Sequence, residues 1–358
     1  MPSNAFNTLL AVVQDVKLWI TPSSQTYAQI PRPNQSTVAV PLWSEEFFTH
    51  CLAKFHFQNF PAAITYNTVL RTLDENAQAQ PRETRQSTHL RAAATKIGYE
   101  IDLGGPSVHL TGKQWKITDG GCGLKPASSF LRPIANRPLP HPTHTEKPLP
   151  DHLRAAFGLP APDENRGICP DPAKALGQWL ELALRPDTNC PPLILTGELR
   201  DEAAEAIRQL IDPASCAMLP FPVSRNEAAW MALYNRVLAF QIFGKITEFK
   251  QNLIRELSQG RFDARLRQTD HKGPVKYEQL GRPVIITAET APEITSNQIV
   301  IEINKCHQIP QQEVLAALFT QMVRSLRDER QAPAQIPYTA NEQALQFKTA
   351  AHLAPPFP

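Results

Sequence analysis

Four short apolar runs in the second half of the chain limit most strongly what it can fold into. The runs are LILT (193–196), VLAF (237–240), PVIIT (283–287) and IVIEI (299–303). Runs of this length that are apolar throughout are typical of strands buried on both faces of a sheet. Because segments with helical periodicity separate them, the pattern predicts an α/β fold, in which helices cover both faces of a parallel sheet.

Shifts in composition divide the chain into five expected parts. The N-terminal segment 1–42 is expected to be mobile, because it leads into a stretch rich in proline, serine and glutamine. Helical stretches and short strand-like pieces predict a small α+β domain over 43–135. A proline-rich linker over 136–170 then leads to the α/β domain over 171–330, and a disordered tail is expected over 331–358.

Bulk composition limits the partners and the chemistry. A formal net charge of +2 over 358 residues gives no general attraction for polyanions, so nucleic acid would need a local basic patch. The 6 cysteines form no C-x-x-C pair, so we expect neither a metal site nor disulfides. No segment approaches the length of a membrane span, and we therefore expect a cytoplasmic protein with no membrane partner.

A strand, a tight turn and a helix are expected between Pro191 and Ile211. The strand ends on a glycine, and apolar residues recur at helical spacing from Ala203 onward. A phosphate-binding loop in this place needs G-x-x-x-x-G-K-[ST]. The chain instead reads GELRDEAAEA (197–206), with one glycine, no lysine and four carboxylates. Carboxylates in the first turn of the helix take the position that favours anions and would repel a triphosphate.

Several segments of the chain resemble, in their sequence and their order, segments of a known family. The family is that of the helicase-like P-loop ATPases (AAA+ or primase-associated ATPases) of phages, plasmids and integrated elements. The similar segments are LILTGE…IRQLIDP (193–213), NRVLAFQI (235–242), SQGRFDAR (258–265), GRPVIITAE (281–289) and PEITSNQIVIEI (292–303). This resemblance spans about residues 98–310. It implies a P-loop NTPase-like parallel sheet with flanking helices as the C-terminal domain, preceded by the small α+β domain.

The chain departs from these ATPases at the positions that carry their chemistry. The degenerate nucleotide-site positions are Gly197, Glu198, Arg200, Asp201, Gln241, Thr287 and Asn297. The resemblance places the positions from Gly197 to Asp201 in the phosphate loop. It places Gln241 where acidic residues would bind magnesium, and Thr287 where a polar sensor is expected. Asn297 stands in place of an arginine that would reach a neighbouring subunit's nucleotide. Counting from either end of the loop fails to restore its lysine and serine or threonine.

Phosphoryl transfer depends on positioning and on charge neutralisation by lysine, magnesium and arginine. The resemblance without these groups implies a pseudo-ATPase that has no catalytic residues and no cofactor. Such a protein would serve mobile-element DNA replication as an interaction protein or a DNA-associated accessory protein. The alternative is an active DNA-dependent ATPase or helicase that binds ATP and Mg²⁺ at an atypical site built on Arg200 and Asp201.

A basic run follows the second apolar run. The candidate DNA contacts in it are Arg261, Arg265, Arg267 and Lys272. Clustered arginine and lysine can bind backbone phosphates, although a solvated loop with charges offset by neighbouring aspartates would have the same composition. The expected partners are therefore an intact homologous ATPase or another replication protein, and DNA through this loop.

Overall fold

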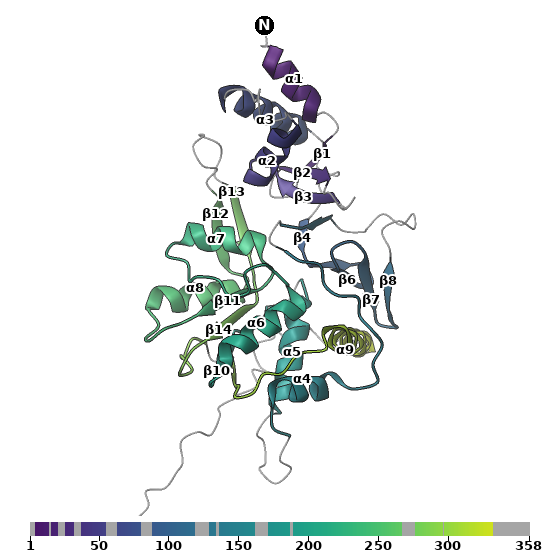
Figure 1. Ribbon diagram of the computed structural model, residues 1–358, viewed down its shortest axis with the longest axis vertical. Coiled ribbons are helices and arrows are strands. Elements are labelled where there is room, and N and C mark those ends of the chain that lie inside the picture. The colour runs from purple at the N-terminus through teal and green to yellow at the C-terminus, as the bar shows by residue number, and fades with distance from the viewer. Residues whose placement is uncertain are drawn as a thin grey trace, which may run out of the picture.

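The computed structural model describes most of the chain (Figure 1). The residues described are 4–13, 16–20, 26–31, 37–54, 63–79, 88–118, 129–133, 136–161, 171–186, 189–266, 276–295 and 297–331. Figure 1 shows the elements nearest the N-terminus at one end of the long axis, above the larger part of the molecule. In the described part of the chain, no helix is both long and apolar enough to cross a membrane.

The four apolar runs form one parallel sheet, which confirms the α/β class. The strands are β10 (Leu193–Thr196), β11 (Leu238–Gln241), β14 (Val284–Thr287) and β15 (Ile299–Glu302). They lie in the order β11-β14-β10-β15, and each neighbouring pair is parallel. Their interiors are buried because helices cover both faces, as the lack of apolar–polar alternation predicts.

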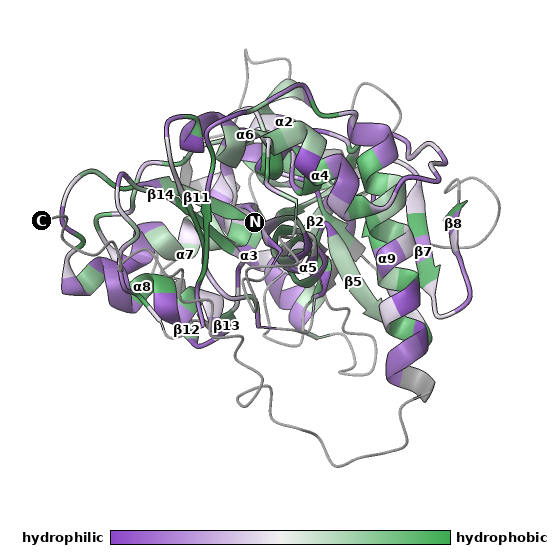
Figure 2. Ribbon diagram, turned by 90° about the horizontal axis from the view of Figure 1, so that it is seen from below, coloured by the Kyte–Doolittle hydropathy of each residue, from purple (hydrophilic) through white to green (hydrophobic). Residues whose placement is uncertain are grey.

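Two hydrophobic clusters lie on opposite faces of this sheet. The helices concerned are α5 (Pro172–Leu184), α6 (Arg200–Ile211), α7 (Arg225–Tyr234), α8 (Glu248–Ser258) and α9 (Gln311–Gln331). Leu195 of β10 belongs to the cluster with α5, α6 and α9, whereas the adjacent Ile194 belongs to the cluster with α7 and α8. Successive side chains of a strand point to opposite faces, so one run serves both cores. Figure 2 shows β11 and β14 coloured as hydrophobic among helices of mixed colour.

An antiparallel meander shares the larger of these cores. Its strands are β5 (Ala92–Thr95), β6 (Gly98–Asp102), β7 (Ser107–Thr111) and β8 (Trp115–Thr118). The indole of Trp115 packs edge-on against Phe319 of α9, with ring centroids 6.1 Å apart, and its N–H donates to the Thr320 hydroxyl at 3.3 Å. The expectation of a separate domain over 43–135 did not anticipate this shared core.

The N-terminal segment contains regular structure, which corrects the expectation of a mobile segment over 1–42. The elements are α1 (Asn4–Val13), β1 (Lys17–Ile20), β2 (Thr26–Pro31), β3 (Thr37–Pro41), α2 (Glu45–Lys54) and α3 (Ala63–Gln78). The strands join β4 (Thr88–Leu90) and β9 (Ser129–Leu131) in the sheet β1-β2-β3-β9-β4. Leu9 and Val13 of α1 are buried against Leu70 of α3, so apolar burial orders the segment. Its most proline- and serine-rich parts, 21–25 and 32–36, lie outside the described residues.

The proline-rich segment also packs on the core, which corrects its description as a linker over 136–170. It contains α4 (Leu149–Phe157), which buries Leu153 and Phe157 in the larger cluster. Upstream of this helix, the backbone N–H of Thr143 donates to the carbonyl of Gln312 at the start of α9, at 3.0 Å. Prolines reduce the conformational freedom of the unfolded chain and favour an extended backbone. A proline-rich segment can therefore pack along a core as well as separate two domains, and the segment 136–161 is called the proline-rich strap. Of the expected tail 331–358, residues 332–358 lie outside the described residues.

Candidate functional site

The carboxyl edge of the parallel sheet is where open α/β sheets bind their ligands. Strand register brings the strand ends together there, because Thr287 is the partner of Gln241 on one side and of Leu195 on the other. Thr196 and Glu302 are also register partners. The carboxyl edge, as named here, comprises Gly197–Asp201, Gln241, Thr287 and Glu302–Asn304.

The turn after β10 is closed by hydrogen bonds within the protein. Gly197 has a φ of 95°, and a Cβ added there would lie 2.4 Å from the carbonyl oxygen of Ile303. The N–H of Leu199 donates to that same carbonyl at 3.2 Å, and the N–H of Glu198 donates to Oδ1 of Asn304 at 3.4 Å. In a phosphate-binding loop, backbone N–H groups at this place point to the ligand. Here the N–H groups of Glu198 and Leu199 instead donate hydrogen bonds to the segment that follows β15.

The side chains in the first turn of α6 are likewise engaged with their neighbours. Nη1 of Arg200 donates to the carbonyl of Gly197 at 3.0 Å, so the cation folds back on its own turn. Oδ2 of Asp201 accepts from Nε2 of Gln241 at 2.8 Å, which joins α6 to the end of β11. The structure therefore brings these predicted positions together, and each is a partner of another part of the same edge.

The remaining predicted positions differ in their placement. Thr287 lies at the carboxyl edge but is fully buried, and its hydroxyl has no hydrogen-bond partner among the described residues. Asn297 is exposed and precedes β15. The resemblance gave Asn297 as standing in place of an arginine that would reach a neighbouring subunit's nucleotide, and the structure places it before β15, at the edge of the sheet opposite the phosphate-loop position. A position before a strand and a position after it are separated by the length of that strand.

Of the predicted DNA contacts, Arg265 belongs to a hairpin made of β12 (Phe262–Leu266) and β13 (Lys276–Leu280). Arg261 is exposed and directly precedes β12. Arg265 lies within β12 and is the register partner of Tyr277. Arg267 and Lys272 lie outside the described residues. The structure thus places Arg261 and Arg265 at the start of a hairpin and within it, while DNA contact stays a prediction.

The sequence reading missed a charged network at the opposite, amino edge. Asp212, which is fully buried, follows α6 and accepts with Oδ2 from the N–H groups of Arg236 and Val237 at 2.8 and 3.0 Å. Its Oδ1 lies 3.5 Å from Nε of Arg91. Arg91 holds a positive φ of 63°, which non-glycine residues seldom adopt. Asp212 lies between an apolar helix pattern and an apolar strand pattern, and a charged residue in such a place is itself a signal of a buried partner.

The amino edge, as named here, comprises Arg91, Asp212, Arg236 and Arg282. The two arginines that precede strands are fixed by backbone carbonyls. Arg236 donates from Nε to Ala183 and from Nη2 to Arg185, at 3.0 and 2.6 Å. Arg282 donates from Nε to Ala232 and from Nη1 to Gly281, both at 2.7 Å.

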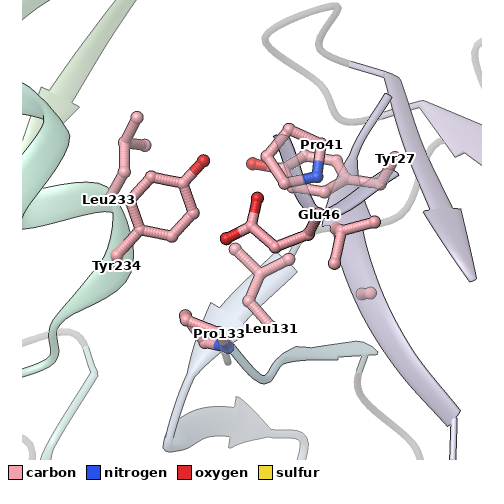
Figure 3. A pocket seen from close by; sticks show the side chains of 9 residues that line it. Tyr27, Pro41, Glu46, Leu131, Pro133, Leu233 and Tyr234 are labelled. Carbon is pink, nitrogen blue, oxygen red and sulfur yellow. The ribbon is translucent and has the colours of Figure 1, made fainter. Parts of the chain in front are cut away.

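A narrow pocket lies beside the amino edge, between α7 and the sheet β1-β2-β3-β9-β4, which is called the N-terminal sheet. Figure 3 shows the ring of Tyr234 from α7 and the carboxylate of Glu46 from α2 directed toward one another across it. Burial, and then the negative charge of Glu46, raise the pKa of Tyr234 above its usual value. Tyr27 and Leu131 complete the wall on the side of the N-terminal sheet. The two parts of the molecule therefore meet across incompletely filled space.

Comparisons with known proteins include a distant structural likeness. No family model matches the chain, and no curated protein matches it. Among solved structures, the A form apo structure of the NrS-1 C-terminal region is similar to this chain at 12% sequence identity and a TM-score of 0.43, covering 90% of this chain and 69% of that chain.

Proposed function

We propose that the chain is a catalytically inactive relative of helicase-like P-loop ATPases, and that it works in mobile-element DNA replication as an accessory protein. The observation that carries this proposal is the closed turn after β10. Its N–H groups and its arginine are bonded to Ile303, Asn304 and Gly197, where an ATPase would hold phosphate.

The charges at the carboxyl edge support the same conclusion. Asp201 and Glu202 lie in the first turn of α6, so carboxylates occupy the end of the helix dipole that attracts anions. Gln241 replaces a magnesium-binding acid and is bonded to Asp201. A triphosphate would have to displace these internal bonds and approach like charge, with no lysine to offset the cost.

We infer an accessory role because the α/β sheet with flanking helices is present, while other residues stand at the positions that the resemblance assigns to catalysis. The buried strands and the two clusters form an extensive core, so the chain can present stable surfaces to a partner. We propose an active homologous ATPase or another replication protein as that partner, with DNA contacted through the hairpin of β12 and β13. No membrane partner and no cofactor are part of this proposal.

Thermal unfolding with and without millimolar Mg·ATP tests the proposal. A ligand that binds only the folded state raises its stability by RT ln(1 + [L]/Kd). We expect no rise in Tm that depends on Arg200. The matched variants are Arg200→Ala and Arg324→Ala, since Arg324 is an exposed arginine on α9. A rise in Tm that persists in Arg324→Ala and disappears in Arg200→Ala would instead support an atypical nucleotide site.

A further inference from the structure

A second pocket, of about 250 Å³, lies at the amino edge between the N-terminal sheet and the α/β part. Arg236 and Arg282 line it from the starts of β11 and β14, and His89 of β4 lines it from the other side. Tyr27 and Leu131 of the N-terminal sheet also contribute. The pocket is therefore built from segments that are far apart in the sequence, and its charged side chains among the described lining residues are both arginines.

The guanidinium groups in this pocket are held in fixed orientations. Arg236 is 6% exposed, and it donates to the carbonyls of Ala183 and Arg185. Arg282 donates to the carbonyls of Ala232 and Gly281. Each guanidinium is a planar fork of five N–H donors, and two bonds to carbonyls define its plane. Donors held in advance lose little entropy when a ligand binds.

The electrostatics of the pocket favour an anion. Burial, and then the positive charge of Arg236, lower the pKa of His89 below its usual value. Burial is the larger cause, and the smaller one shows that the guanidinium of Arg236 lies close enough to His89 to act on its charge. An anion in the pocket would offset this positive charge and would lie between His89 and the two arginines.

We propose that this pocket binds a phosphate-class oxyanion. Guanidinium forks match both carboxylate and phosphate oxygens. Two arginines in a pocket that His89 and Tyr27 also line suit a group that carries more than one negative charge and several acceptor oxygens, as phosphate does. The pocket volume of about 250 Å³ is near the lower limit of small-ligand sites, which fits a phosphate or pyrophosphate with ordered water.

The proposed ligand would join the two parts of the molecule. Arg236 and Arg282 belong to the α/β part, whereas His89 and Tyr27 belong to the N-terminal sheet. The neighbouring pocket of Figure 3 shares Tyr27, Leu131 and Leu233 with this one. Because the ligand fills space at a sparsely filled junction, we expect it to stabilise the folded chain measurably.

Titration of the full chain with inorganic pyrophosphate tests the proposal. We expect pyrophosphate to raise Tm more than sodium chloride or malonate does at equal ionic strength. In Arg282→Ala, pyrophosphate should bind roughly tenfold more weakly or worse, because charge-assisted hydrogen bonds are lost. Arg324→Ala, which removes an exposed arginine of α9, should bind like the natural chain. Equal effects of chloride and pyrophosphate, a preference for malonate, or unchanged binding by Arg282→Ala would each overturn the site.

A measurement on the natural chain does not depend on the folding of any variant. Phenylglyoxal modifies accessible arginines, and mass spectrometry reports which ones react. Pyrophosphate should slow modification of Arg282 at least severalfold while leaving Arg324 unchanged, and equal rates with and without pyrophosphate would contradict the proposal. Single-stranded oligonucleotides with a 5′-phosphate or a 5′-hydroxyl then identify the source of the phosphoryl group. Protection by the 5′-phosphate alone assigns a nucleic-acid end, and protection by pyrophosphate alone assigns a free phosphate.

This site is independent of the proposed function, and the two can fail separately. ATP carries phosphates and could enter the arginine pocket without reaching the carboxyl edge. A stabilisation by ATP that Arg282→Ala removes belongs to the amino edge, whereas one that Arg200→Ala removes belongs to the carboxyl edge. The first result leaves the pseudo-ATPase proposal intact, and the second overturns it whatever pyrophosphate does.

Discussion

The two edges of the parallel sheet differ in how their polar groups are used. At the carboxyl edge, Arg200 and Asp201 are partly buried and bond to groups within the same edge. At the amino edge, Asp212 is fully buried and Arg236 is 6% exposed, and both bond to segments that are distant in sequence. The edge at which a ligand is expected is closed on itself, while the opposite edge gathers cations around a pocket.

The comparison shows that the buried charges of this fold lie at the amino edge, whereas the segment that resembles a phosphate-binding motif lies at the carboxyl edge. Removing a charge from water costs several kcal/mol unless it is paired and hydrogen-bonded. The chain meets this condition at the amino edge with carbonyls, two backbone N–H groups and an ion pair. At the carboxyl edge it avoids the cost, because Gln241 is neutral and Arg200 stays partly exposed.

Asp212→Ala is expected to have the largest effect and to test the amino edge. The change removes the acceptor for two buried N–H groups and leaves the guanidinium of Arg91 without its buried carboxylate. Loss of one partner from a buried pair costs about 3–5 kcal/mol, which urea unfolding would measure. Asp201→Ala at the carboxyl edge removes one hydrogen bond and should cost only about 0.5–1.5 kcal/mol. Equal costs for both variants would remove the contrast between the edges.

Gly197→Ala should have the next largest effect and tests the closed turn. Gly197 and Gly244 both have positive φ, but a Cβ at Gly197 would meet the Ile303 carbonyl at 2.4 Å, whereas nothing lies within 4 Å at Gly244. We expect Gly197→Ala to lower the free energy of unfolding by about 2–4 kcal/mol, and Gly244→Ala by about 1 kcal/mol from backbone strain alone. Similar losses measured in urea would show that the turn is not held against Ile303.

A smaller effect is expected for the bond between α6 and β11. Gln241→Ala removes one hydrogen bond to Asp201, which is worth about 0.5–1.5 kcal/mol. A double-mutant cycle with Asp201→Ala isolates that pair, because each single variant removes the same bond. The account expects a coupling energy within this range. A coupling energy near zero would mean that the side chains of Gln241 and Asp201 are not hydrogen-bonded to each other at the carboxyl edge.

The smallest effect expected is on the pH dependence of stability, and it sharpens the description of the amino edge. The pKa of His89 is lowered in the folded state, so the unfolded chain binds more protons as pH falls. The stabilising contribution of neutral His89 to the free energy of unfolding is therefore complete above about pH 6.5. It decreases as pH falls below that value, by at most about 1.4 kcal/mol per pH unit. His89→Gln should flatten the stability profile between about pH 7 and 5, and pyrophosphate should flatten it in the natural chain. Profiles that coincide for the natural chain and His89→Gln would contradict this assignment.

The sequence predicted the part of the fold that rests on local apolar pattern. The four buried strands coincide with the apolar runs, and Asp171 caps α5 as its position before Pro172 suggests, by accepting from Ala173 and Lys174. The turn at Gly197 was also placed correctly at the end of β10. These features depend on residues close in sequence, whose spacing is visible without knowing the tertiary contacts.

The features that were missed depend on contacts between distant segments. Nothing local marks Asn304 as the acceptor that closes the turn at Glu198, or Thr143 as the residue that ties the proline-rich strap to α9. Asn297 lies at the edge opposite the phosphate-loop position, and its place before an apolar run already indicates this. The pocket at the amino edge gathers Arg236, Arg282 and His89 from three separate segments, and only the fold brings them together.

The central claim, that the carboxyl edge does not hold a nucleotide, is tested most directly by calorimetric titration of Mg·ATP into Arg282→Ala. In that variant the arginine pocket is disabled, and the carboxyl edge is unchanged. The account predicts no heat of binding up to millimolar ATP. A dissociation constant tighter than about 1 mM that disappears on adding Arg200→Ala would contradict it.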